Sequence, residues 1–139
     1  MGTGHRLLAV FVAMILLSGC DAWPTSVWNH TASSITFSYH HKQYKQWSYP
    51  LDISGGHATK LARGHYLGDV SGIKIIDQGK VYLLSDESVT ALQNRCWRGI
   101  MQKVTTLGDC YLTYLGDGRL RASISEPSGL PDHGWNNGG

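Results

Sequence analysis

The chain has 139 residues, with 12 lysines and arginines against 10 aspartates and glutamates, and its formal net charge is +2. This length allows one domain with its own hydrophobic core. The charges are scattered and form no basic stripe, which argues against a nucleic-acid-binding protein, so we expect no nucleic-acid partner.

The first element is a short apolar segment at residues 7–17, LLAVFVAMILL, which follows the basic residue Arg6. Eleven apolar residues are too few to cross a membrane, because a spanning helix needs about 20. A basic start followed by a short apolar core is typical of a secretory signal peptide. We therefore expect residues 1–19 to be a cleaved signal peptide.

The apolar segment ends in Leu17-Ser18-Gly19-Cys20, which resembles the lipobox of bacterial lipoproteins at every position. The resemblance covers only the first twenty residues, and we recognise no family in the rest of the chain. It implies cleavage between Gly19 and Cys20, a diacylglyceryl group on the Cys20 thiol and, in many species, acylation of the new amine. Two or three acyl chains hold a protein stably on a bilayer. This covalent lipid is the only cofactor that we expect; the alternative is an ordinary signal peptide with a chance cysteine.

Asp21 directly follows the cysteine. In enterobacterial lipoproteins, an aspartate at this position resembles the signal that keeps the protein in the inner membrane. The resemblance therefore implies an anchor in the bacterial cell membrane, on the periplasmic face of the inner membrane, with the outer membrane as the alternative. Residues 20–32 have no clear period, so we expect a lipidated tether, with Trp28 packing on the domain.

Residues 33–125 are expected to form a single β-rich periplasmic domain. Ile35, Phe37 and Tyr39 alternate with polar residues, and such alternation is typical of a half-buried strand. The sequence therefore predicts a strand over residues 33–41.

Alternation returns at residues 47–53, WSYPLDI. It predicts a second strand with four inward side chains: Trp47, Tyr49, Leu51 and Ile53. Pro50 has no N–H to donate to a neighbouring strand, so this strand is expected at the edge of a sheet.

The middle of the chain predicts a short strand near Thr59–Ala62 and then a β-hairpin. Residues 73–76 and 81–84 are apolar, and they flank Asp77-Gln78-Gly79-Lys80. Two apolar runs around a short turn of this composition are a hairpin signal.

A single helix is predicted over about residues 86–98. Ser85 or Asp86 can cap the first amides, and acidic residues suit the start of a helix. Apolar side chains then follow at helical spacing, and Gly99 marks the expected end. They are Val89, Leu92, Cys96 and Ile100.

Further strands are expected over residues 101–106, 110–115 and 119–124, the last two joined by a turn at Gly116-Asp117-Gly118. Residues 126–139 are rich in proline and glycine and are expected to form a flexible tail. The whole pattern predicts a mainly β fold, either a small antiparallel β-sandwich or an α+β sheet with one short helix.

Cys96 and Cys110 remain as an even pair once Cys20 carries lipid. In an oxidising compartment, such a pair is typical of a disulfide. Closing this loop would stabilise the fold by roughly 3 kcal/mol. Two buried free thiols, or half of a metal site, are the alternatives.

Residues 39–49, YHHKQYKQWSY, interleave aromatic side chains with basic and amide groups. We take His40, Lys42 and Tyr44 as a possible ligand surface for a sugar ring or an acidic peptide, against the alternative that the rings of this segment pack in the core. His40 and His41 are neighbours on a strand and point to opposite faces. With no H-x-H or H-x-x-x-H spacing, we expect no metal site.

The sequence contains no catalytic motif, so no catalytic residue is assigned. The function that we expect is a non-enzymatic accessory or adaptor protein of the cell envelope, with the lipid bilayer and an envelope protein as partners. The first alternative is a glycan- or metal-binding module that uses residues 39–49, and the next is a small envelope hydrolase.

Overall fold

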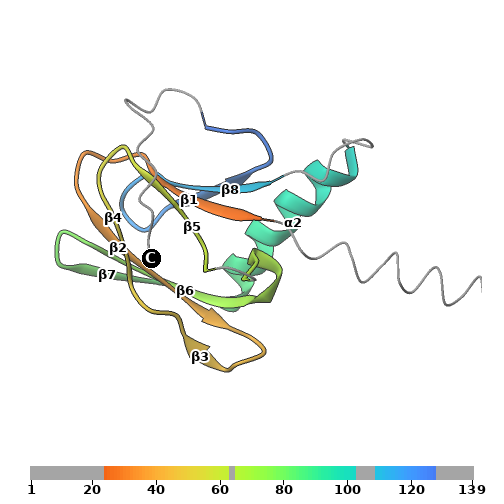
Figure 1. The fold of residues 1–139 in the computed structure, drawn as a ribbon, viewed down its shortest axis with the longest axis horizontal. Helices are drawn as coiled ribbons and strands as arrows, with labels where there is room; N and C mark the ends of the chain where they lie inside the picture. Colours follow the sequence, from red (N-terminus) through yellow and green to blue (C-terminus); the bar gives the residue numbers. More distant parts are fainter. Residues whose placement is uncertain (1–23, 63–64, 103–108, 128–139) are drawn as a thin grey trace, which may run out of the picture.

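The computed structural model describes residues 24–62, 65–102 and 109–127, and side chains are described there except at residues 97–102. Two β-sheets lie face to face, and one α-helix lies beside them (Figure 1). This confirms the predicted mainly β fold. The elements are β1 (Thr25–Asn29), β2 (Ile35–His41), β3 (Gln46–Trp47), β4 (Leu51–Ile53), β5 (Ala58–Lys60), η2 (Leu67–Asp69), β6 (Val70–Asp77), β7 (Lys80–Leu84), α2 (Asp86–Gln102), β8 (Cys110–Tyr114) and β9 (Leu120–Ser123).

The first sheet has the strand order β5-β1-β8-β9, so β1 lies between two partners. All five residues of β1 are buried. The prediction of a tether over residues 20–32 is therefore wrong for Thr25–Asn29. Val27 lies in the core between the sheets, whereas Trp28 packs in a separate buried cluster with Ala58 and Tyr111. Because both faces of β1 are covered, its sequence shows no alternation.

The pairing of β1 with β8 is parallel, with Thr25 opposite Cys110 and Asn29 opposite Tyr114. The other strand pairs described in the two sheets are antiparallel. Parallel neighbours need a long crossover between them. Here the crossover contains the whole second sheet and α2.

The second sheet has the order β3-β2-β6-β7, and β4 also pairs with β2. The β6–β7 hairpin forms as predicted, with Asp77 opposite Lys80. Gln78 and Gly79 make its turn, and their φ angles of 48° and 78° are those of the turn type that suits a tight hairpin.

The edge strand is broken where one continuous strand over residues 47–53 is predicted. Trp47 lies opposite His40, and Leu51 lies opposite Phe37. Two residues thus lie between the partners on β2 and three lie between those on the edge, so one extra residue on the edge shifts the phase of the alternation. Trp47 and Tyr49 are consequently exposed, which corrects their predicted inward placement, while Ile53 is buried as expected.

The helix α2 begins where predicted, and the Ser85 hydroxyl accepts a hydrogen bond from the Ser88 amide at 3.3 Å. It continues to Gln102, so the predicted end at Gly99 is wrong. A glycine inside a helix costs only about 1 kcal/mol, which packing can offset. The expected strand over residues 101–106 is thus wrong at its start, and residues 103–108 lie outside the described part.

Cys96 of α2 and Cys110 of β8 form a disulfide, as the sequence predicts, with 5.7 Å between their Cα atoms. Both side chains are fully buried. The bond ties the helix to the start of β8, beside the central strand of the first sheet. Together with the packing of α2 on β6 and β9, it closes one side of the sandwich.

The strand after the last turn, β9, lies within the predicted residues 119–124. Of the predicted tail, only Glu126 and Pro127 are described, and Pro127 is buried. The signal peptide, Gly19, Cys20 and Asp21 lie outside the described residues.

Candidate binding surface

The segment 39–49, here called the hairpin segment, joins the end of β2 to β3 and continues to the gap before β4. It carries lysines and histidines and no carboxylate. Three of its rings are exposed, at 56% for Tyr44, 44% for Trp47 and 91% for Tyr49. The prediction that its rings pack in the core therefore holds only for Tyr39, which is buried.

The outer face of the hairpin segment carries a cluster of His40, Trp47 and Lys74. The His40 and Trp47 ring centroids are 5.5 Å apart, and the Lys74 ammonium lies 5.2 Å from the Trp47 ring centroid. The Nδ1 atom of His40 is 2.7 Å from the Ser71 hydroxyl. A cation over an indole ring is a favourable contact that also holds the ring in place.

The inner face carries a second cluster, made of His41, Tyr44 and His65. The ring centroid of His41 is 4.5 Å from that of Tyr44 and 4.7 Å from that of His65. His41 is buried, while Tyr44 covers it from the solvent side. Residues far apart in the sequence thus build one stack at this end of the sandwich.

Hydrogen bonds link His65 to Tyr39 and Tyr39 to the Ala62 main chain. The Ala62 amide donates to the Tyr39 hydroxyl, whose oxygen is 2.6 Å from Nδ1 of His65. Burial raises the pKa of Tyr39, and the bond from Ala62 opposes that shift.

The pKa of His65 is lowered from its ordinary value, first by burial and second by the nearby His41. The carboxylate of Asp69 opposes this shift. The Asp69 main-chain oxygen also accepts a hydrogen bond from the Lys42 amide at 2.7 Å, which anchors the turn of the hairpin segment. Burial and the nearby His41 thus favour the neutral form of His65.

The predicted ligand residues do not lie together. His40 is on the outer face, Tyr44 is in the inner cluster, and Lys42 is exposed in the turn. Sequence reasoning did not find Lys74 or the exposure of Trp47 as parts of this surface. The only sequence signal for Lys74 is the alternation of β6, because it places Lys74 opposite Ser38 on the outer face.

In the part of the chain that the structure describes, no group of three or more histidine, cysteine or acidic side chains comes together that could hold a metal ion. His57 lies apart from the inner cluster, with Nδ1 2.9 Å from the Gly55 carbonyl oxygen.

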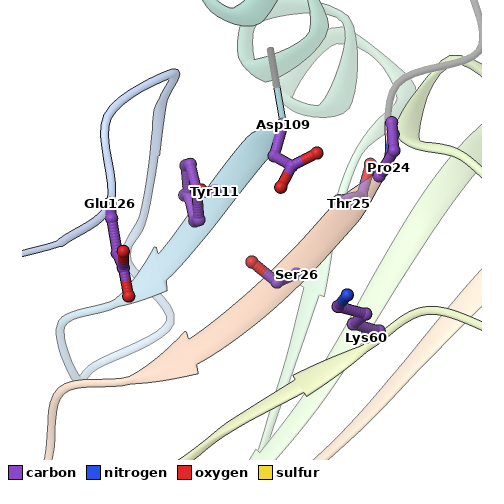
Figure 2. A pocket seen from close by; sticks show the side chains of 7 residues that line it. All are labelled: Pro24, Thr25, Ser26, Lys60, Asp109, Tyr111 and Glu126. Atoms are coloured by element: carbon purple, nitrogen blue, oxygen red, sulfur yellow. The ribbon is translucent and has the colours of Figure 1, made fainter. Parts of the chain in front are cut away.

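A small pocket of about 80 Å³ lies at the start of β1 and β8 (Figure 2). Lys60, Asp109, Tyr111 and Glu126 line it, together with the first residues of the β1 region. Burial raises the pKa of Tyr111, and the charges of Asp109 and Glu126 raise it further. Ligand pockets usually measure about 300–1,000 Å³, so this pocket is too small for an organic ligand.

Comparison with known protein families, with curated proteins and with solved structures finds no match to this chain. Among the described residues, no helix has the length and apolar character needed to cross a membrane.

Proposed function

We propose that this chain is a lipid-anchored accessory or adaptor protein of the bacterial cell envelope, which holds a partner protein on the second sheet. The lipobox-like Leu17-Ser18-Gly19-Cys20 supports the anchor. The lipid would be attached only four residues before Pro24, where the described domain begins. The domain would therefore work close to the bilayer surface.

The observation that carries the binding role is the position of the exposed apolar side chains. The large ones in the described residues all lie on the second sheet or its hairpin segment: Tyr44, Trp47, Tyr49, Val81 and Leu83. Large exposed apolar side chains that gather on one part of a surface are typical of a protein–protein contact.

The strand register places several of them on one face. Lys74 lies opposite both Ser38 and Leu83, and Trp47 lies opposite His40. Directly opposed residues share a face of a sheet. The outer face of the second sheet therefore runs from Trp47 at one edge to Leu83 at the other, with Lys74 between them.

The charge of this surface indicates the kind of partner. The hairpin segment contributes Lys42 and Lys45 and no carboxylate, and Lys74 lies at the centre of the outer face, while one carboxylate, Asp52 opposite Thr36, lies on the same face. A protein surface with carboxylates around an apolar centre is complementary to it. The proposed partner is thus an envelope protein with an acidic, partly apolar patch.

The test is a pull-down of the tagged full chain from cross-linked membranes. We expect one envelope protein to be recovered with the unchanged chain and lost with the double variant Trp47→Ser/Leu83→Ser. The matched control is Asn94→Ala, an exposed position on α2, which should recover the partner. Equal recovery with the double variant would exclude the second sheet as the binding surface.

The anchor is tested separately with Cys20→Ala. Loss of the lipid should release the chain from washed membranes, because no acyl chain then holds it. If the chain remains membrane-bound without Cys20, the proposed lipid anchor is wrong.

A glycan-binding module is the alternative, and the exposure of Tyr44, Trp47 and Tyr49 favours it. Flat aromatic faces can stack on sugar rings. A glycan binder should lose its ligand in Tyr44→Ala while the fold survives, and an array of envelope glycans would detect this. Glycan binding that survives in Tyr44→Ala and Trp47→Ala would exclude these rings.

A further inference from the structure

A groove of about 440 Å³ lies between α2 and the edge strand β9, and no residue of the hairpin segment lines it. One wall is a single helical face, because Ser88, Ala91, Leu92 and Arg95 follow the spacing i, i+3, i+4, i+7. The other wall is the segment from Gly118 to Ala122. The small side chains of Ser88 and Ala91 leave space between the two walls.

The floor of the groove is apolar. Leu92 and Ala122 belong to the hydrophobic core, and Leu84 and Leu120 pack against it while remaining partly exposed. An occupant with small or aliphatic side chains would cover the exposed part of this floor.

Arginines supply the charge of the groove. Arg95 comes from α2, and Arg119 and Arg121 come from the β9 side. No lining residue is acidic. Arg119 donates to the carbonyl oxygens of Gly116 and Leu115, at 3.3 Å and 3.5 Å. Within the described residues, the structure gives the side chains of Arg95 and Arg121 no hydrogen-bond or ion-pair partner.

The outer edge of β9 faces away from β8. The Leu115 amide donates to the Arg119 carbonyl oxygen at 2.9 Å, and Arg121 lies opposite Thr113. Because hydrogen-bonded and non-hydrogen-bonded pairs alternate in an antiparallel ladder, the main-chain groups of Arg119 and Arg121 point to β8. Those of Leu120 and Ala122 therefore point to the outer edge, where the described sheet has no further strand.

From the free edge, the apolar floor and the arginines together, we infer that this groove binds an extended acidic peptide segment of a partner protein, which adds to β9 as a strand. Main-chain hydrogen bonds to Leu120 and Ala122 would supply the pairing. Carboxylates on alternate residues would reach the guanidinium groups, which match a carboxylate with two parallel hydrogen bonds. The inference stands on different residues from the proposed function and does not depend on it.

The experiment is a fluorescence anisotropy titration of the full chain, purified from membranes in mild detergent, with labelled heptapeptides of alternating sequence. We expect a Glu-Val peptide to bind and a Lys-Val peptide not to bind. A Glu-Val peptide with every amide N-methylated has no main-chain N–H on either edge and cannot pair as a strand, and it should bind no better than the Lys-Val peptide. Equal binding of all three peptides, or no saturable binding of the Glu-Val peptide, would overturn the inference.

Variants locate the binding. Arg95→Ala and Arg121→Ala should each weaken binding of the Glu-Val peptide about tenfold, as expected for the loss of one charge-assisted hydrogen-bonded contact. Ala91→Trp should block the groove without removing a charge. Asn94→Ala, exposed on the same helix and outside the groove, is the control and should bind normally.

Other occupants give different results. Dimerisation of the chain that Ala91→Trp abolishes, measured by light scattering without peptide, would assign the groove to a second copy. Binding to phosphatidylglycerol vesicles that depends on Arg95 and Arg121, without peptide binding, would assign it to anionic lipid. Either result would overturn the peptide assignment.

Discussion

Tyr114 is the side chain that joins the two sheets at one end of the sandwich. It is fully buried, its hydroxyl donates to Oδ2 of Asp77 at 2.7 Å, and it accepts a bond from the Gly118 amide at 3.2 Å. Tyr114→Phe leaves both partners without this bond, so we expect the free energy of unfolding to fall by about 1–3 kcal/mol. Urea unfolding measures it, and Tyr49→Phe, at an exposed ring, should change nothing.

The same hydroxyl gives an alkaline limit to stability. Burial first, and the hydrogen bond to Asp77 second, raise the pKa of Tyr114 from 10.0 to about 12. The folded state holds this proton more tightly than the unfolded state, so the resulting stability is full below pH 10 and is lost as pH rises from 10 to about 12. Tyr114→Phe should flatten this part of the pH–stability profile.

His65 acts in the acidic range with the opposite sign. Its pKa is lowered in the folded state by burial and by His41. The unfolded state therefore binds its proton more readily, and stability should fall as pH drops below 6.5. Urea unfolding midpoints at about pH 7.5 and about pH 5 measure this loss, and His65→Phe should reduce it. An unchanged loss in the variant would place the acid sensitivity elsewhere.

Among the secondary-structure elements, β1 is the strand that the sequence pattern does not predict. Val27 is fully buried at its centre and belongs to the main core. We expect Val27→Ala to lower the free energy of unfolding by about 2–3 kcal/mol, because the cavity lies between the sheets. His30→Ala, at an exposed position directly after β1, is the control. If Val27→Ala has no effect, this segment is a tether after all.

Local sequence patterns predict the elements that have one solvent-exposed face. The alternation of β2, the turn at Gln78-Gly79 and the start of α2 near Asp86 all express local chemistry. The parallel partner of β1 is not predictable in this way, because β8 follows only after the whole second sheet. The phase shift between Trp47 and Leu51 is not predictable either. The apolar and polar residues of the sequence still alternate when one extra residue is inserted in an edge strand.

The candidate binding surface is likewise predictable from the sequence only in part. The composition of the hairpin segment, with its aromatic and basic side chains, is the only basis for the hypothesis of a ligand surface there. The phase shift then decides that Trp47 faces outward. Likewise, the contact of His65 with His41 depends on how β6 returns along β2, and no spacing in the sequence encodes it.

For the whole molecule, the disulfide is the covalent tie between α2 and the first sheet. It closes a loop with a sequence separation of 14 between Cys96 and Cys110. We expect the double variant Cys96→Ser/Cys110→Ser to lose about 2–4 kcal/mol of unfolding free energy. Thermal unfolding with and without reductant measures it, and reductant should have no effect on the variant. An equal response of both proteins to reductant would contradict the structural role of the bond.

The parallel pairing of β1 with β8 affects the order in which the two sheets can form. The strands of the second sheet all lie between Ile35 and Leu84, a stretch that also contains β5 of the first sheet, so they can meet soon after they are synthesised. The strand β1 can meet β5 early, but its other edge stays open until β8 has been made. An open edge on a nascent chain is a place where two molecules can pair wrongly. The first described strand of this protein is thus among the last to be completed, and slow synthesis of the C-terminal half would lengthen its exposure.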